Sequence, residues 1–110
     1  MDRVSHQVVV LRRAELELYD NALWWAENRD PDQAVRWLEG FQAAISGLAV
    51  NAQQHGQIEE AHLFDFPVQQ LLFGIGKKPT HRAVFRIRGD KVYVYTVRHL
   101  HQQELSPDDL

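Results

Sequence analysis

The feature that most limits the fold is a pair of alternating segments, residues 82–88 and 91–99, separated by a Gly-Asp pair. Gly-Asp suits a two-residue hairpin loop, in which the backbone adopts positive φ angles. A loop of this length fixes the register of the two strands and places Arg82 opposite Val97. The sequence therefore predicts an antiparallel β-hairpin in the last third of the chain.

Side chains alternate between the two faces of this predicted hairpin. One face is apolar and would pack against helices; it comprises Ala83, Phe85, Ile87, Val92, Val94 and Thr96. The other face mixes guanidinium, phenol and imidazole groups; it comprises Arg82, Val84, Arg86, Tyr93, Tyr95, Val97 and His99. Since Arg82 is assigned to the second face, we expect it to lie outside the core and its loss to cost the fold little.

The segments before the hairpin change from a strand-like to a helix-like period. A short β-branched run, residues 8–10, predicts a strand that leads into a helix over residues 12–28. Asp30 can cap a second helix and Pro31 suits its first turn. This second helix should continue to about residue 50 and form an antiparallel hairpin with the first.

The remaining segment divides into a loop and a strand. Residues 51–67 show no clear period, whereas residues 68–76 indicate a strand. A chain of 110 residues can bury one core, so we expect a single domain spanning residues 1–110. The predicted class is α+β, with an N-terminal strand, an antiparallel helical hairpin and a three-stranded antiparallel sheet. The order is β-α-α-β-β-β, and the helices cover one face of the sheet.

Positive charge is concentrated in the hairpin of an otherwise acidic chain. The net charge is −3, yet seven basic residues and one acidic residue lie between Lys77 and His101. The rest of the chain carries five basic and fourteen acidic residues. Such segregation indicates either a local anion-binding surface or a solvated sheet edge, and composition does not decide between them.

Several classes of site and location are not indicated by the sequence. It contains no metal-ligand spacing, Gly-rich phosphate loop or hydrolase nucleophile motif, so no metal and no cofactor is expected. There is no cysteine for disulfide or thiol chemistry. No apolar run is long enough to span a membrane, and the first residues lack the layout of a signal peptide. The expected location is the cytoplasm.

Two stretches together resemble the RelE/ParE superfamily of toxins from type II toxin-antitoxin systems, also called plasmid stabilisation proteins. The first, AELELYDNALWWAENRDPDQAVRWLEGFQAAISGL, is similar to the helical hairpin of the family. The second, HRAVFRIRGDKVYVYTVRH, is similar to its ending YRVLY-x-x-x-x-D-x-V-x-V-x-x-V-x-H. The resemblance covers nearly the whole chain. It implies a small sheet with the helical hairpin on one side, and an antitoxin partner that wraps the toxin.

The resemblance also implies a set of site residues. RelE-like members cut messenger RNA in the ribosomal A site, with basic residues that hold the phosphates and an acid/base group that assists attack by the 2′-OH. By their place in the motif and after the last strand, the predicted catalytic residues are Arg82, Arg98, His99 and His101. Phosphate clamping by Arg and stacking by Tyr extend this to predicted RNA-binding residues, which are Lys77, Lys78, His81, Arg86, Tyr93 and Tyr95.

Three functions are compatible with this resemblance. The first expectation is a toxin that acts as a metal-independent endoribonuclease (mRNA interferase) on the ribosome. The second is a ParE-like inhibitor of DNA gyrase, which needs only a protein-binding surface. The third is an inactive family member whose main partner is its antitoxin. The tail QQELSPDDL departs from the basic or Tyr-ending tails of RNA cleavers. In each case we expect an acidic and apolar antitoxin segment to dock over the hairpin and the neighbouring helix, because Val84, Tyr95 and Val97 leave apolar surface among the positive charges.

Overall fold

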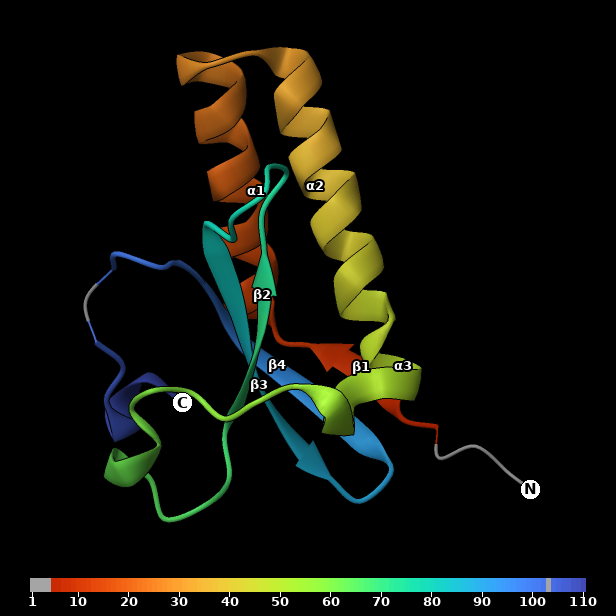
Figure 1. Ribbon diagram of the computed structural model, residues 1–110, viewed down its shortest axis with the longest axis vertical. Helices are drawn as coiled ribbons and strands as arrows, with labels where there is room; N and C mark the ends of the chain where they lie inside the picture. The colour runs from red at the N-terminus through yellow and green to blue at the C-terminus, as the bar shows by residue number, and fades with distance from the viewer. Residues whose placement is uncertain (1–4, 103) are drawn as a thin grey trace.

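The computed structural model describes residues 5–102 and 104–110, which form one sheet covered by a helical hairpin (Figure 1). The strands are β1 (Gln7–Val10), β2 (Gln69–Phe73), β3 (His81–Arg88) and β4 (Lys91–His99). The helices are α1 (Arg12–Asn28), α2 (Pro31–Ser46) and the short α3 (Leu48–Asn51). The predicted α+β class is confirmed. None of the described helices is long and apolar enough to cross a membrane.

The N-terminal strand belongs to the sheet, which therefore has four strands rather than the predicted three. The strand order is β1-β4-β3-β2, and β1 runs parallel to β4, with Val8 opposite Val92. The other neighbouring pairs are antiparallel. Parallel strands need a long connection, which the helical hairpin supplies between β1 and the later strands. The three-stranded prediction was wrong because the short apolar run could not by itself show its pairing partner.

The second helix begins as the sequence predicts but ends earlier. The Asp30 carboxylate accepts a hydrogen bond from the backbone N–H of Asp32 at 2.9 Å, and Pro31 occupies the first helical position. This satisfies one of the N–H groups that a helix start leaves without a partner. Helix α2 stops at Ser46, and Gly47 separates it from α3.

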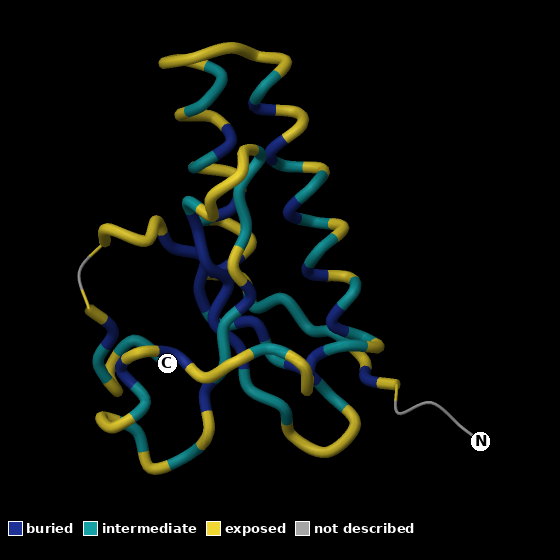
Figure 2. The backbone as a smooth tube through the Cα atoms, in the orientation of Figure 1, coloured by how far each residue is buried: buried dark blue, intermediate teal, exposed yellow. Residues whose placement is uncertain are grey.

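The main core lies between the helical hairpin and the sheet. Buried side chains from the three helices and from strands β2, β3 and β4 form one cluster, and Figure 2 shows the buried positions along the inner sides of the helices and in the central strands. Trp37, Phe41 and Phe85 are completely buried in it. Removing an aromatic side chain from such a core costs about 3–5 kcal/mol, so this cluster fixes how the hairpin lies on the sheet.

A second apolar cluster covers the face of the sheet that the sequence predicts to be open. Val84 of β3 is buried there against Ile58 and Val68, from the segment between α3 and β2, and against Leu105 near the C-terminus. Figure 1 shows the C-terminal segment and the 52–68 segment lying together on this side of the sheet, and a hydrogen bond from Leu105 to Glu60 joins them. The face is therefore an interior surface.

A β-bulge changes which residues of the predicted hairpin share a face. The register shifts between Val84 and Phe85, so that Arg82 pairs with Arg98 instead of the predicted Val97. Val97 consequently packs into the core under the helices. A bulge inserts one unpaired residue, which reverses the side-chain alternation beyond it. The predicted face assignment therefore holds along β3 and is wrong in β4 beyond the bulge, at Thr96 and Val97.

Candidate functional site

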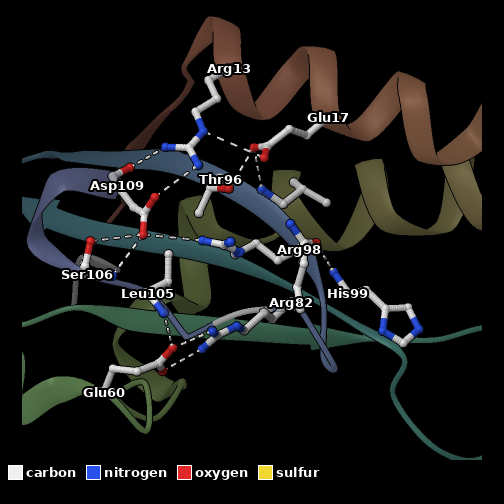
Figure 3. A network of polar contacts seen from close by, with 12 residues as sticks. Arg13, Glu17, Glu60, Arg82, Thr96, Arg98, His99, Leu105, Ser106 and Asp109 are labelled. Atoms are coloured by element: carbon white, nitrogen blue, oxygen red, sulfur yellow. Dashed lines mark hydrogen bonds and ion pairs between the residues drawn. The ribbon is translucent and has the colours of Figure 1, made fainter.

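Arg82, the predicted phosphate-binding arginine, is buried, and both of its terminal nitrogens donate to neighbouring side chains (Figure 3). Its Nη1 and Nη2 donate hydrogen bonds to the two carboxylate oxygens of Glu60, at 2.9 and 2.6 Å. Nη1 also donates to the side-chain oxygen of Gln70 at 3.1 Å. Only 8% of Arg82 is exposed, so the expectation that it lies outside the core is wrong. The bidentate geometry is the strongest form of an arginine–carboxylate pair.

Glu60 joins three segments through one carboxylate. Besides binding Arg82, it accepts a hydrogen bond from the backbone N–H of Leu105 at 2.8 Å. The hydrogen bonds from Arg82, above all, lower the pKa of Glu60 from its usual 4.5 to about 2, against the opposing effect of burial. The carboxylate is therefore ionised at neutral pH, and it ties the C-terminal segment to the sheet.

Arg98 lies beside Arg82 in the sheet and is also buried, with 7% of its surface exposed. Its Nη1 is 3.7 Å from a carboxylate oxygen of Asp109, which is too long for a hydrogen bond but close enough for an ion pair. Asp109 accepts a hydrogen bond from the backbone N–H of Ser106, and this bond is the main reason that its pKa lies below the usual value. The C-terminal segment thus supplies a carboxylate to the second arginine.

Glu17 of α1 completes the polar network at the other side of β4. It accepts hydrogen bonds from the Thr96 hydroxyl at 2.7 Å and from the backbone N–H of Val97 at 3.2 Å (Figure 3). Strand β1 pairs with β4 only as far as Val94, so the backbone beyond that point needs another acceptor. Glu17 fills this role, and it was not among the residues singled out from the sequence.

The three histidines of the hairpin end have different environments. His81 is 3% exposed, and its ring lies 4.9 Å from that of Trp37. Its Nε2 bonds with Asn21 Oδ1 at 3.1 Å and its Nδ1 with the Thr80 hydroxyl at 2.7 Å. Burial lowers the pKa of His81 to about 4, with a smaller contribution from neighbouring His99. His81 is therefore neutral at pH 7, and both of its ring nitrogens are already used.

His99 and His101 are exposed and lie close together, with ring centroids 5.2 Å apart. The Nδ1 atom of His99 accepts a hydrogen bond from the backbone N–H of His101 at 3.1 Å. Of the four predicted catalytic residues, only these two are exposed to solvent, because Arg82 and Arg98 are buried. The two predicted catalytic arginines do not supply an unpaired charge beside these histidines, because Arg82 and Arg98 are paired with carboxylates.

The predicted RNA-binding residues do not form a continuous cationic surface. The Arg86 guanidinium lies 3.7 Å from the centroid of the Phe66 ring, a cation–π contact that keeps it half-buried. Tyr93 and Tyr95 are also half-buried. Lys77 and Lys78 are exposed in the turn that precedes β3.

A cleft of about 510 Å³ opens beside the Arg82–Glu60 pair. Its walls combine three carboxylates with two carboxamides, Arg82 and two leucines; the lining residues are Glu59, Glu60, Gln70, Leu72, Arg82, Leu100, Gln102 and Glu104. Arg82 balances one of the carboxylates, which leaves the cleft negative. A phosphodiester backbone would be repelled by this field. In the described residues there is no group of three or more His, Asp or Glu side chains placed to hold a metal ion.

Comparisons with known proteins agree with the fold. No family model and no curated protein matches this sequence. Nine solved chains match the structure. One belongs to a structure described as "Chromosomal ParDE TA system from P. aeruginosa", with a TM-score of 0.70 and 16% sequence identity. The match covers 88% of this chain and 98% of that chain. The two chains share a fold. This is the fold that the resemblance to the RelE/ParE superfamily implies.

Proposed function

We propose that this chain is the toxin of a type II toxin-antitoxin pair, and that it acts by binding a protein rather than by cutting RNA. DNA gyrase is the proposed target. The fold supports the first part, because it is shared over most of its length with a chain from a ParDE TA system. The observation that carries the second part is the engagement of Arg82 by Glu60.

Cleavage of RNA by 2′-OH attack needs positive charge at the scissile phosphate. The charge of Arg82 is already balanced by Glu60, and withdrawing the guanidinium toward a phosphate would strand a buried carboxylate without its partner. Separating a buried ion pair in this way costs about 3–5 kcal/mol. The carboxylates of Glu59 and Glu104 add repulsion in the adjoining cleft. A surface that binds a protein target has no such requirement.

A second candidate is supported by His99 and His101. Both are exposed, and a histidine placed at a reacting group contributes about 10²- to 10⁴-fold to proton-transfer catalysis. If the ribosome supplied positive charge at the scissile phosphate, these side chains would be the acid/base groups. Ribosome-dependent mRNA cleavage is therefore the function against which gyrase inhibition should be tested.

The antitoxin is the other proposed partner, and of the two elements expected to bind it, the helix offers more apolar surface than the hairpin. Val84 and Val97, which were expected to offer apolar surface on the hairpin, are at most 1% exposed. Exposed apolar side chains lie instead along α1, where Leu16, Tyr19 and Leu23 are each about half-exposed. These positions recur at steps of three and four and so share one side of the helix. We place the antitoxin contact there.

The purified full chain should be assayed in parallel against DNA gyrase and in a translating extract. The proposal predicts loss of DNA supercoiling by gyrase while messenger RNA in the extract stays intact. Messages cut at paused codons, with supercoiling unaffected, would replace gyrase inhibition with the second candidate. No effect in either assay, together with normal growth of cells expressing the chain alone, would leave an inactive binding module.

A further inference from the structure

A second cleft, distinct from the one beside Arg82, lies between the C-terminal half of α1 and the end of the hairpin where β3 begins and β4 ends. It has a volume of about 430 Å³, within the range of small-molecule sites. The cleft is lined by two tryptophans, two histidines, an arginine and two neutral polar side chains; these are Asn21, Trp24, Trp25, Arg29, Thr80, His81 and His99. Only His99 enters a function discussed above, as an acid/base group of the second candidate.

The floor of this cleft is rigid and neutral. His81 is held by Asn21 and Thr80 through both ring nitrogens and packs on Trp37. With Asn21 Oδ1 as acceptor, the ring proton is assigned to Nε2, and Nδ1 accepts from the hydroxyl of Thr80. Since these bonds use both ring nitrogens of the imidazole, His81 forms part of the cleft floor but has no polar atom left to bind a ligand.

The groups that remain free in the cleft favour an anion. Within the described part of the chain, Arg29 has no carboxylate partner. His99 uses Nδ1 to accept from His101, which leaves its Nε2 as a donor. The lining contains no carboxylate, although the chain as a whole has a net charge of −3. This is therefore a locally cationic cleft in an acidic protein.

The tryptophans add a flat stacking surface. Trp24 is 50% exposed, and its ring lies edge-to-face against Trp25, with centroids 6.1 Å apart. The guanidinium of Arg29 is 5.9 Å from the centroid of the Trp24 ring. A half-exposed tryptophan beside an arginine that lies over its ring and has no carboxylate partner among the described residues presents an aromatic plane and a phosphate donor within the reach of one small ligand.

We propose that this cleft binds a nucleoside monophosphate, either free or as the terminal residue of a single strand. The base stacks on Trp24, and Arg29 and His99 donate to the phosphate. A cationic ligand is disfavoured because Arg29 already lies near the Trp24 ring and would repel it. A purely apolar ligand would leave the guanidinium and imidazole donors without acceptors. The proposal does not rest on the toxin function.

The test is an NMR titration of the isotope-labelled full chain with adenosine monophosphate, followed through the indole N–H signals of Trp24 and Trp25. Adenosine and inorganic phosphate serve as half-ligands, and a short oligoadenylate with a terminal phosphate distinguishes a strand end from a free nucleotide. We expect the monophosphate to bind more tightly than either half-ligand. We also expect Trp24→Ala and Arg29→Ala each to weaken binding by about tenfold or more, the loss of a stacking or charge-assisted contact.

Val35→Ala is the matched control, since Val35 is 52% exposed on the neighbouring helix α2 and does not line the cleft. It should bind the nucleotide as the wild type does. Trp24 and Arg29 are exposed, so their variants should fold, which circular dichroism verifies. The proposal is overturned if the monophosphate produces no shift at about 10 mM, where even a weak site would be occupied. It is equally overturned if inorganic phosphate binds as well as the nucleotide, or if Trp24→Ala leaves the affinity unchanged.

Discussion

Replacing Glu60 by glutamine should destabilise the protein far more than a typical polar substitution. Glutamine has the same shape and can still accept the hydrogen bond from the backbone N–H of Leu105. It cannot, however, balance the charge of Arg82, of which 8% is exposed. Leaving one member of a buried ion pair without its partner costs about 3–5 kcal/mol. That is a large share of the roughly 5–15 kcal/mol that stabilises a domain of this size.

The assay is urea denaturation at pH 7, followed by circular dichroism. Glu59→Gln is the control, because its side chain is exposed next to Glu60; we expect a change within about 0.5 kcal/mol. The double substitution Glu60→Gln and Arg82→Met removes both charges and should recover much of the lost stability, since well-packed neutral groups often replace a buried pair at little cost. A loss below about 1 kcal/mol for Glu60→Gln alone would refute the structural role assigned to the pair.

Three further predictions concern pH and backbone packing. The pKa of Glu60 is lowered to about 2, so the stability that this carboxylate contributes is fully present above pH 4.5 and is lost as the pH falls toward 2. The urea midpoint should therefore decline less across this range in Glu60→Gln than in the wild type. The pKa of His81 is lowered to about 4, so the unfolded chain takes up a proton that the folded chain does not between pH 6.5 and 4. Stability should fall through that window, and less so in His81→Gln. A Cβ at Gly74 would lie 2.5 Å from the backbone oxygen of Lys78, so Gly74→Ala should lower the free energy of unfolding by about 1–3 kcal/mol. A Cβ at Gly76 would have no neighbour within 4 Å, so Gly76→Ala is the control and should not show this clash. Thermal melts of the two variants compare their stabilities.

The parts of the fold that follow from a regular period could be predicted from the sequence. The apolar stripes of α1 and α2, the Asp30 cap and the hairpin loop are local signals, and each one is found where it was expected. The bulge between Val84 and Phe85 has no such signal. One inserted residue leaves the alternation intact on either side, so only the packed structure shows where the two halves change phase.

The candidate site was harder to predict because its decisive partners are distant in sequence and lie in irregular segments. Glu60 is 22 residues from Arg82, within a segment that shows no clear period. Asp109 lies in the C-terminal tail, which was noted only for departing from the tails of RNA cleavers. A motif can therefore place an arginine in the sheet without showing that a carboxylate elsewhere in the chain already occupies it. Because Glu60 neutralises Arg82, the cationic face expected around this arginine is not found.

The most direct test of the central claim, that Arg82 stabilises the fold and does not contact RNA, is growth arrest by the double variant carrying Glu60→Gln and Arg82→Met. Expression of the wild-type chain and of this variant should be induced at matched levels, with folding verified by circular dichroism. Equal growth arrest by the two proteins is the predicted result, because the toxic surface does not include Arg82. If the wild type arrests growth and the folded variant does not, the claim is contradicted, and a role for Arg82 in RNA cleavage would have to be considered again.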